Sequence, residues 1–229
     1  MIKIILARQK ILFFISSIVL ITYITSPVCY GNMLSNPGAE TGSLANWATD
    51  DPLVVVASQS QQESSGWVYP YSGDWFFNMC GQAVGSAITE RVLYQDIDMS
   101  SYASDIDADL VLFQASIYLQ TEDVQGMSGK DSAQLTLYFL DEYSSEIDST
   151  STGLVQSPNL TWIQQTLNGS VPAGTRTIRY ELLGRKEEGT WLNAFFDAAE
   201  VTVIPEPATA LLLGLGSLAV LRKRRRINR

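Results

Sequence analysis

Between residues 32 and 204, apolar and polar side chains alternate repeatedly with a period of two, and no long stretch has the period of about 3.6 residues of an amphipathic helix. In the clearest stretch, residues 111–120, Val, Phe, Ala, Ile and Leu alternate with Leu, Gln, Ser, Tyr and Gln. About eight strands separated by polar turns predict an all-β domain, a single β-sandwich of the jelly-roll type. The Ser-, Thr- and Asp-rich stretch 141–153 is expected to be a long hairpin loop. The other strands are expected at 53–57, 75–79, 89–97, 134–139, 161–168, 177–182 and 192–203.

The N-terminal segment, residues 1–31, has the layout of a secretory signal peptide. Basic residues at Lys3, Arg8 and Lys10 precede an apolar run of 14 residues, 11–24, which is short for a membrane span. Small residues follow Pro27, and cleavage is expected near Gly31. An uncleaved N-terminal anchor is the alternative.

The C-terminal segment, residues 205–229, combines three features in a fixed order. Pro205, Glu206 and Pro207 come first, an uncharged run of 14 residues rich in Ala, Leu and Gly follows at 208–221, and five basic residues occupy 222–226. The basic cluster is expected to stay in the cytoplasm, because positively charged segments flanking a membrane helix are retained there. With an exported N-terminus, this arrangement predicts a domain outside the inner membrane and a hydrophobic helix holding it there.

This order of features resembles the PEP-CTERM sorting signal of Gram-negative bacteria, many of which produce exopolysaccharide. The resemblance implies recognition by an exosortase, a membrane cysteine transpeptidase, and processing at or near Pro205-Glu206-Pro207. The protein would reside transiently in the inner membrane and then reach the cell surface, the outer membrane or the extracellular matrix. A permanent C-terminal anchor is the alternative.

Charge and composition exclude several classes of function. Residues 32–204 hold six Lys and Arg against 23 Asp and Glu, a net charge of about −17. So acidic a domain repels nucleic acid, whose binding needs clustered basic residues, and it also repels anionic lipid. The chain has no histidine, which removes Ser-His-Asp and Cys-His catalytic groups. Cys80, the cysteine that remains once Cys29 leaves with the signal peptide, has no histidine to activate it and no partner for an intrachain disulfide.

The opening of the exported region, N-M-L-S-N-P-G-A-E-T-G-S-L-A-N-W at residues 32–47, is similar to the opening of galactose-binding-like jelly rolls. Many carbohydrate-binding modules and the F-box-associated domain begin in this way. Segments 95–98, 174–181 and 191–201 resemble later strands of the same family, in the same order. The resemblance implies one galactose-binding-like jelly-roll domain over residues 32–204.

The same resemblance implies a structural calcium site between Glu40 and Asp197. Calcium takes carboxylate and carbonyl oxygens, which an acidic pair beside a glycine-rich turn can supply. Ala198 stands where the family has a second acidic residue, and Ala39 stands where it has an aromatic one. The alternative is that both carboxylates cap turns or accept backbone hydrogen bonds.

Aromatic residues offer a candidate glycan site. Trp67, Tyr69 and Tyr71 lie close together in the sequence, and the neighbouring Gly66, Pro70 and Gly73 predict an exposed loop. Their rings are expected to stack on a neutral sugar, because the charge of the domain repels polyanionic ones. Ordinary packing is the alternative, since aromatic side chains mostly serve cores.

These features together predict an exported, non-catalytic protein of the cell surface or extracellular matrix, with a role in adhesion or biofilm structure and with binding of a neutral glycan or exopolysaccharide. One alternative is a secreted glycan hydrolase or lyase, which needs two carboxyl groups across a sugar cleft. No single pair stands out among the many acidic residues. A purely structural matrix protein without a ligand is the other alternative.

Overall fold

The computed structural model of the chain describes residues 31–62, 66–82, 90–122, 131–158, 160–187 and 191–205. Gly31–Pro205 forms one compact unit. Apart from Gly31 and Pro205, the predicted signal peptide and sorting segment, Glu206 and Pro207 included, lie outside the described residues. Within the described ranges, no helix is both long enough and apolar enough to cross a membrane.

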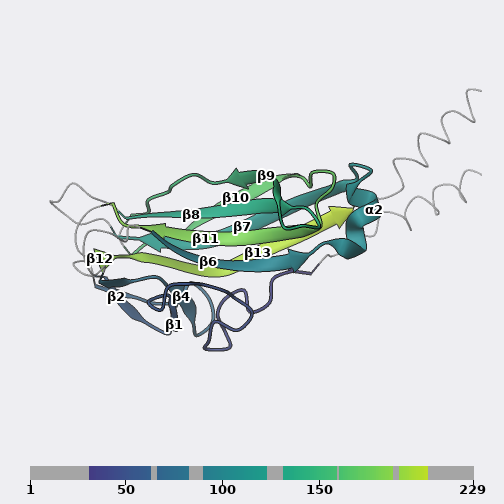
Figure 1. Cartoon of the computed structure of the whole chain (residues 1–229). Helices are drawn as coiled ribbons and strands as arrows, with labels where there is room; N and C mark the ends of the chain where they lie inside the picture. The colour runs from purple at the N-terminus through teal and green to yellow at the C-terminus, as the bar shows by residue number, and fades with distance from the viewer. Residues whose placement is uncertain are drawn as a thin grey trace, which may run out of the picture. The chain divides into compact units, whose positions relative to one another are not determined.

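The fold is a sandwich of two antiparallel sheets, which confirms the predicted class (Figure 1). The first sheet has five strands in the order β1-β4-β13-β7-β10, and the second has four in the order β6-β11-β8-β9. The strands of the five-stranded sheet are β1 (Val55–Ala57), β4 (Phe76–Asn78), β13 (Ala194–Pro205), β7 (Val111–Thr121) and β10 (Ile163–Ser170). Those of the four-stranded sheet are β6 (Glu90–Asp98), β11 (Thr177–Arg185), β8 (Ser132–Leu140) and β9 (Glu146–Ser151).

Short elements complete the two ends of the sandwich. A small hairpin joins β2 (Ser60–Gln62) to β3 (Gly66–Val68), and β5 (Gly81–Gln82) pairs with β12 (Trp191–Leu192). The connection from β6 to β7 contains a single 3-10 turn, η1 (Ser100–Tyr102), and one helical turn, α2 (Ala103–Ile106). The last strand, β13, runs toward the end of the sandwich that carries α2 (Figure 1).

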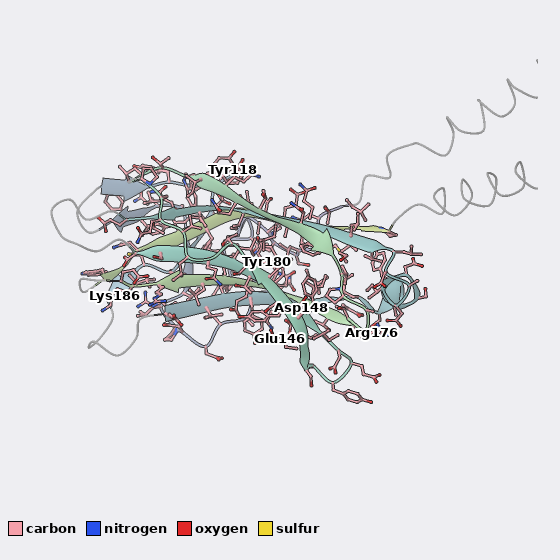
Figure 2. The ribbon with its side chains drawn as sticks, turned by 90° about the horizontal axis from the view of Figure 1, so that it is seen from above. Tyr118, Glu146, Asp148, Arg176, Tyr180 and Lys186 are labelled. Carbon is pink, nitrogen blue, oxygen red and sulfur yellow. The ribbon has the colours of Figure 1, made fainter. Side chains whose placement is uncertain are left out.

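The core lies between the sheets and follows the alternation in the sequence. Along β7, the side chains at 111, 113, 115, 117 and 119 are all buried, and along β11 those at 178, 180 and 182 are buried opposite them. One polar contact crosses this core: the hydroxyl of Tyr180 donates a hydrogen bond to the carbonyl oxygen of Ser116 at 2.6 Å (Figure 2). Burial raises the pKa of Tyr180 well above its usual value, so the hydroxyl stays protonated and keeps donating.

Two details differ from the sequence-based expectations. The predicted hairpin loop at 141–153 contains β9, which pairs with β8 in a register that places Ser151 opposite Thr136. This strand was missed because it lies at a sheet edge with nearly all of its side chains exposed, so it carries no apolar alternation. The predicted aromatic loop also begins as a strand, because Trp67 belongs to β3.

Candidate functional site

A cavity of about 210 Å³ is lined by aromatic, aliphatic and amide side chains from three separate parts of the chain. One part is β3 with the residues that follow it, another is the end of β7, and the third is the segment that leads into β10. Because Gln120 alternates along β7 with the buried core residue Leu119, it lies on the outer face of the five-stranded sheet. The lining residues, here termed the aromatic cavity, are Trp67, Val68, Tyr69, Pro70, Gln120, Leu160 and Trp162.

A second, smaller apolar cluster holds the aromatic cavity in place. Phe76 of β4 and Phe195 of β13 are fully buried together with Val68 of β3, and Trp162 packs against them. The rings of Phe76 and Trp162 meet edge to face with centroids 6.0 Å apart. The Trp162 indole nitrogen donates to the carbonyl oxygen of Tyr69 at 3.0 Å, which ties this ring to the segment after β3. The cavity is therefore built on packed side chains of the sheet.

The aromatic cavity combines exposed rings with a buried polar group that lacks a partner. Trp67 is 50% exposed and Tyr69 is 57% exposed, although both are large apolar side chains. Gln120 is only 1% exposed, and within the described ranges its Nε2 is a buried side-chain nitrogen without a hydrogen-bond partner. Such a donor costs the folded state about 1–3 kcal/mol unless a ligand or water accepts its hydrogen bond. A sugar hydroxyl has the right chemistry to accept it.

Tyr71, the third residue of the predicted aromatic site, does not line the cavity. Its ring stacks on Tyr118 of β7, with centroids 3.6 Å apart and an interplanar angle of 14°. A hydrogen bond with Tyr118 is the main cause that raises the pKa of Tyr71. Tyr118 and Gln120 are two residues apart on β7, so they lie on the same face, about 7 Å apart along the strand. The stacked tyrosines therefore extend the surface that begins at the aromatic cavity.

Three residues of this surface were not predicted from the sequence: Tyr118, Gln120 and Trp162. For the first two a signal exists, because both occupy the polar side of the alternation at 111–120. Trp162 gave no such signal, since Tyr69 and Phe76, which it contacts, are more than 80 residues away in the sequence.

The structure brings the predicted calcium ligands Glu40 and Asp197 together on one turn, residues 72–74. The amide of Ser72 donates to Asp197 Oδ2 at 3.0 Å, and the amide of Asp74 donates to Glu40 Oε2 at 3.0 Å. The turn needs glycine at its centre, because Gly73 has φ +68° and a Cβ there would collide with the Glu40 carboxylate. A β-bulge between Asp197 and Glu200 interrupts the pairing of β13 with β7 beside this turn.

The acidic pair fits a calcium ion in its donor chemistry. A Cβ built on Gly38 would lie 3.2 Å from Asp197 Oδ1 and 3.5 Å from Glu40 Oε1, so both carboxylates reach the same small region. Burial is the main cause that raises the pKa of Asp197 to about 6, and the charge of Glu40 adds to it. No group of three or more His, Cys, Asp or Glu side chains in the described part of the chain could hold a metal. Calcium usually takes about 6–8 oxygen ligands. A calcium ion bound by Glu40 and Asp197 would therefore need backbone carbonyl oxygens to complete its coordination. The alternative role predicted for these two carboxylates is to accept backbone hydrogen bonds, as they do from the amides of Ser72 and Asp74.

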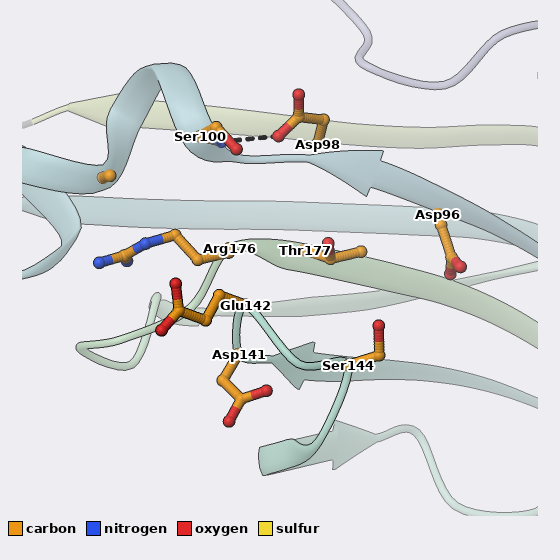
Figure 3. A pocket seen from close by; sticks show the side chains of 9 residues that line it. Asp96, Asp98, Ser100, Asp141, Glu142, Ser144, Arg176 and Thr177 are labelled. Atoms are coloured by element: carbon orange, nitrogen blue, oxygen red, sulfur yellow. Dashed lines mark hydrogen bonds between the residues drawn. The ribbon is translucent and has the colours of Figure 1, made fainter.

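A separate cavity of about 490 Å³, at the end of the sandwich that carries α2, is rich in carboxylates and tests the hydrolase alternative (Figure 3). A glycosidase needs a general acid whose pKa is raised. Here Asp98 accepts a hydrogen bond from the amide of Ser100 at 2.8 Å, and hydrogen bonds from Ser100 lower the pKa of Asp98. Asp96 is held by the Arg179 guanidinium through two hydrogen bonds of 2.8 and 2.9 Å. Asp98 is therefore not prepared to act as a general acid. The lining residues are Asp96, Asp98, Ser100, Ala103, Asp141, Glu142, Ser144, Arg176 and Thr177.

Cys80 is not suited to nucleophilic catalysis. Its thiol donates to Asn193 Oδ1 at 3.1 Å, and burial is the main cause that raises the pKa of this thiol to about 11. The thiolate, which is the nucleophile, is therefore scarce at neutral pH.

Comparison with known proteins identifies the sorting segment. A family model described as the PEP-CTERM protein-sorting motif matches residues 203–226. No curated protein matches the chain in sequence. The chain therefore carries a PEP-CTERM sorting motif directly behind a jelly-roll sandwich, which implies an exported protein that an exosortase sorts to the cell surface.

Solved structures share the sandwich at low sequence identity. The enzymatically active domain of tailspike protein 4 of bacteriophage CBA120 is 15% identical, with a TM-score of 0.53 over 76% of this chain and 21% of that one. A cyclase from Fischerella sp. TAU is 13% identical, with a TM-score of 0.52 over 77% of this chain and 98% of the other. The CBM22-1 xylan-binding domain from Paenibacillus barcinonensis Xyn10C is 13% identical, with a TM-score of 0.47 over 77% and 96%. At these identities the likeness concerns the fold alone.

Proposed function

We propose that the exported domain is a non-catalytic glycan-binding module, displayed at the cell surface or in the extracellular matrix, where it holds exopolysaccharide in a biofilm. The observation that carries the proposal is the aromatic cavity, in which exposed Trp67 and Tyr69 surround a buried Gln120 with an unpartnered donor. Aromatic faces cover the apolar C–H side of a sugar ring, and an amide donor recognises one of its hydroxyls. The pair Tyr71 and Tyr118 extends the platform for a second sugar.

The preferred ligand is a neutral polysaccharide. Residues 32–204 carry a net charge of about −17, which repels acidic chains. The residues that line the aromatic cavity are all uncharged. Contacts of this kind depend little on ionic strength, because salt screens charges and leaves stacking unaffected.

Binding of the compact unit, residues 31–205, to arrays of neutral and acidic polysaccharides tests the proposal. Trp67→Ala and Tyr69→Ala are each expected to weaken binding about tenfold or more, as central aromatic contacts do in other interfaces. Tyr143→Ala is the control, because Tyr143 is an exposed tyrosine in the turn after β8, outside the aromatic cavity. Equal binding by all of these variants would exclude this site. Retention of the protein in the matrix without any glycan binding would favour the purely structural alternative.

Gln120→Met distinguishes a role in glycan binding from a role in stability. The change is expected to lower glycan affinity without lowering the melting temperature. Methionine fills a similar volume and removes the buried donor, so the melting temperature is expected to stay equal or rise. Glycan affinity is expected to fall, since the hydroxyl of the sugar loses its donor. A fall in both quantities would show that Gln120 serves packing instead of binding.

A further inference from the structure

The folded domain and the sorting motif share residues. The family match begins at Val203, which is 1% exposed in the core, and Pro205 is both the first residue of P-E-P and the last residue of β13. Pro205 lies opposite Val111 of β7 in the sheet. No linker therefore separates the domain from the motif.

The position of β13 in the sheet fixes where the motif is presented. Near its end β13 pairs with β7, from Glu200 opposite Ser116 to Pro205 opposite Val111, so freeing that end for an enzyme would break this pairing. The three residues of P-E-P span at most about 10 Å when fully extended. An enzyme that acts at P-E-P must therefore approach to within that distance of the end of β13, close enough to contact the domain.

Three exposed aliphatic side chains surround this end of the sheet, and they are here termed the sorting-end patch. Leu110, Leu112 and Ile204 are 41%, 39% and 37% exposed. Leu112 and Ile204 are direct partners in the register of β7 with β13, and Leu110 follows the same alternation as Leu112. All three therefore lie on the same face, next to the residue where the motif begins.

We propose that the sorting-end patch is the surface with which the folded domain docks on the exosortase while the enzyme acts at P-E-P. Carboxylates near this end, Asp105 and Asp109, disfavour an anionic lipid surface as the occupant. Three side chains are too few for a stable dimer of the domain, since stable interfaces bury about 1,200–2,000 Å². A small contact suffices for the exosortase, because binding of the tail within the same chain supplies a high effective concentration.

Processing of the full-length precursor in its native host tests the docking surface. In a pulse–chase experiment, the double variant Leu110→Ser, Leu112→Ser, which leaves residues 203–226 unchanged, is expected to lose its tail roughly tenfold more slowly, the size expected when buried aliphatic contact is lost. Ile147→Ser, Leu154→Ser is the matched control, because these side chains are 41% and 42% exposed and lie in or just after β9. A host without exosortase should process neither form. Equal rates for the patch variant and the unmutated chain would overturn the proposal.

A spacer distinguishes docking from a loss of folding. Ten Gly and Ser residues placed after Pro205, followed by a repeat of Val203–Pro205, regenerate the motif away from the domain. With this spacer, the patch variant and the unmutated patch are expected to be processed at equal rates, because the enzyme no longer needs to touch the domain. A defect that persists with the spacer would indicate a folding effect and would overturn the proposal. Two other outcomes would also overturn the proposal. One is binding of the unmutated domain to vesicles of phosphatidylethanolamine and phosphatidylglycerol that the patch variant abolishes. The other is dimerisation of the unmutated domain in sedimentation that the patch variant abolishes.

Discussion

The two outer faces of the sandwich are both polar in sequence, but they use their polar groups differently. On the four-stranded sheet the charged groups satisfy one another: Arg179 binds Asp96 through two hydrogen bonds and lies 4.2 Å from the centre of the Tyr94 ring. The hydroxyl of Tyr138 likewise donates to Glu181 at 3.3 Å. On the five-stranded sheet, exposed rings lie beside a buried amide nitrogen that has no hydrogen-bond partner among the described residues.

This difference is the reason why the proposed glycan site lies on the five-stranded sheet. A face whose donors and acceptors pair internally gains little from a bound molecule, because binding would have to break those pairs. A face with exposed rings and an unpartnered donor gains both apolar contact and a hydrogen bond. The completeness of hydrogen bonding, more than the number of polar residues, separates the proposed binding face from the opposite one.

The largest expected effect concerns the second apolar cluster, which contains Val68, Phe76 and Phe195. Among the described residues, only the five-stranded face carries such a cluster. Phe195→Ala removes a fully buried ring from beneath Val68 and Trp162 and is expected to lower the free energy of unfolding by about 3–5 kcal/mol. Glycan binding should fall with it, because Trp162 loses its support. Leu183→Ala, on the outer face of the other sheet, should cost clearly less in a denaturant titration. Equal costs would show that the two faces are built alike.

The alternation of the sequence was sufficient to predict the sheets, because burial of every second residue leaves a periodic signal at Val111–Leu119 and Thr177–Leu182. It could not reveal β9, whose side chains are almost all exposed. Nor could it reveal the aromatic cavity as a whole. Trp67, Gln120 and Trp162 meet because three distant segments fold onto one face, and local pattern contains no such information. The pairing of Glu40 with Asp197 came from a family resemblance instead of from the residues alone.

A pH titration of stability tests the carboxyl of Asp131, which lies where the two sheets join. Asp131, just before β8, accepts hydrogen bonds from the amide of Asn193, just before β13, at 2.7 Å and from that of Glu187 at 3.3 Å. Burial is the main cause that raises the pKa of Asp131 from 3.8 to about 7, and nearby Glu122 adds to it. The folded state therefore holds a proton that the unfolded chain releases, so stability should fall as pH rises between about 4 and 7.

The loss has an upper limit of about 4 kcal/mol, at about 1.4 kcal/mol for each pKa unit. Thermal melts between pH 6 and 7.5 give the clearest window, because Asp197, with its pKa raised to about 6, contributes a slope of the same sign at lower pH. Asp131→Asn should flatten the slope in this window, because it removes the carboxyl that takes up the proton. An unchanged slope in Asp131→Asn would mean that this carboxyl titrates normally.

Calcium should stabilise the five-stranded side specifically, through Glu40 and Asp197. A metal that binds only the folded state adds about 2.7 kcal/mol at a hundredfold excess over its dissociation constant. Differential scanning calorimetry of residues 31–205 should show a higher melting temperature with calcium and a lower one with chelator. Glu40→Ala should abolish the difference, and Glu90→Ala, on the other sheet, should preserve it. If calcium leaves the unmutated domain unaffected, the acidic pair serves only as an acceptor of backbone hydrogen bonds.

The smallest effect is expected on the four-stranded face, from Arg179→Ala. The side chains of Arg179 and Asp96 are 33% and 44% exposed, so solvent screens their attraction. Exposed ion pairs of this kind contribute less than about 1 kcal/mol, and the contribution shrinks as salt is added. Glycan binding should be unchanged, because the pair lies on the sheet opposite the aromatic cavity. Tyr118→Ala provides the contrast on the five-stranded face, where stability should change little while glycan binding weakens as Tyr71 loses its stacking partner. If Arg179→Ala instead reduced glycan affinity as much as Tyr118→Ala, the charged face would take part in recognition, and internal pairing would no longer mark a surface as closed to ligands.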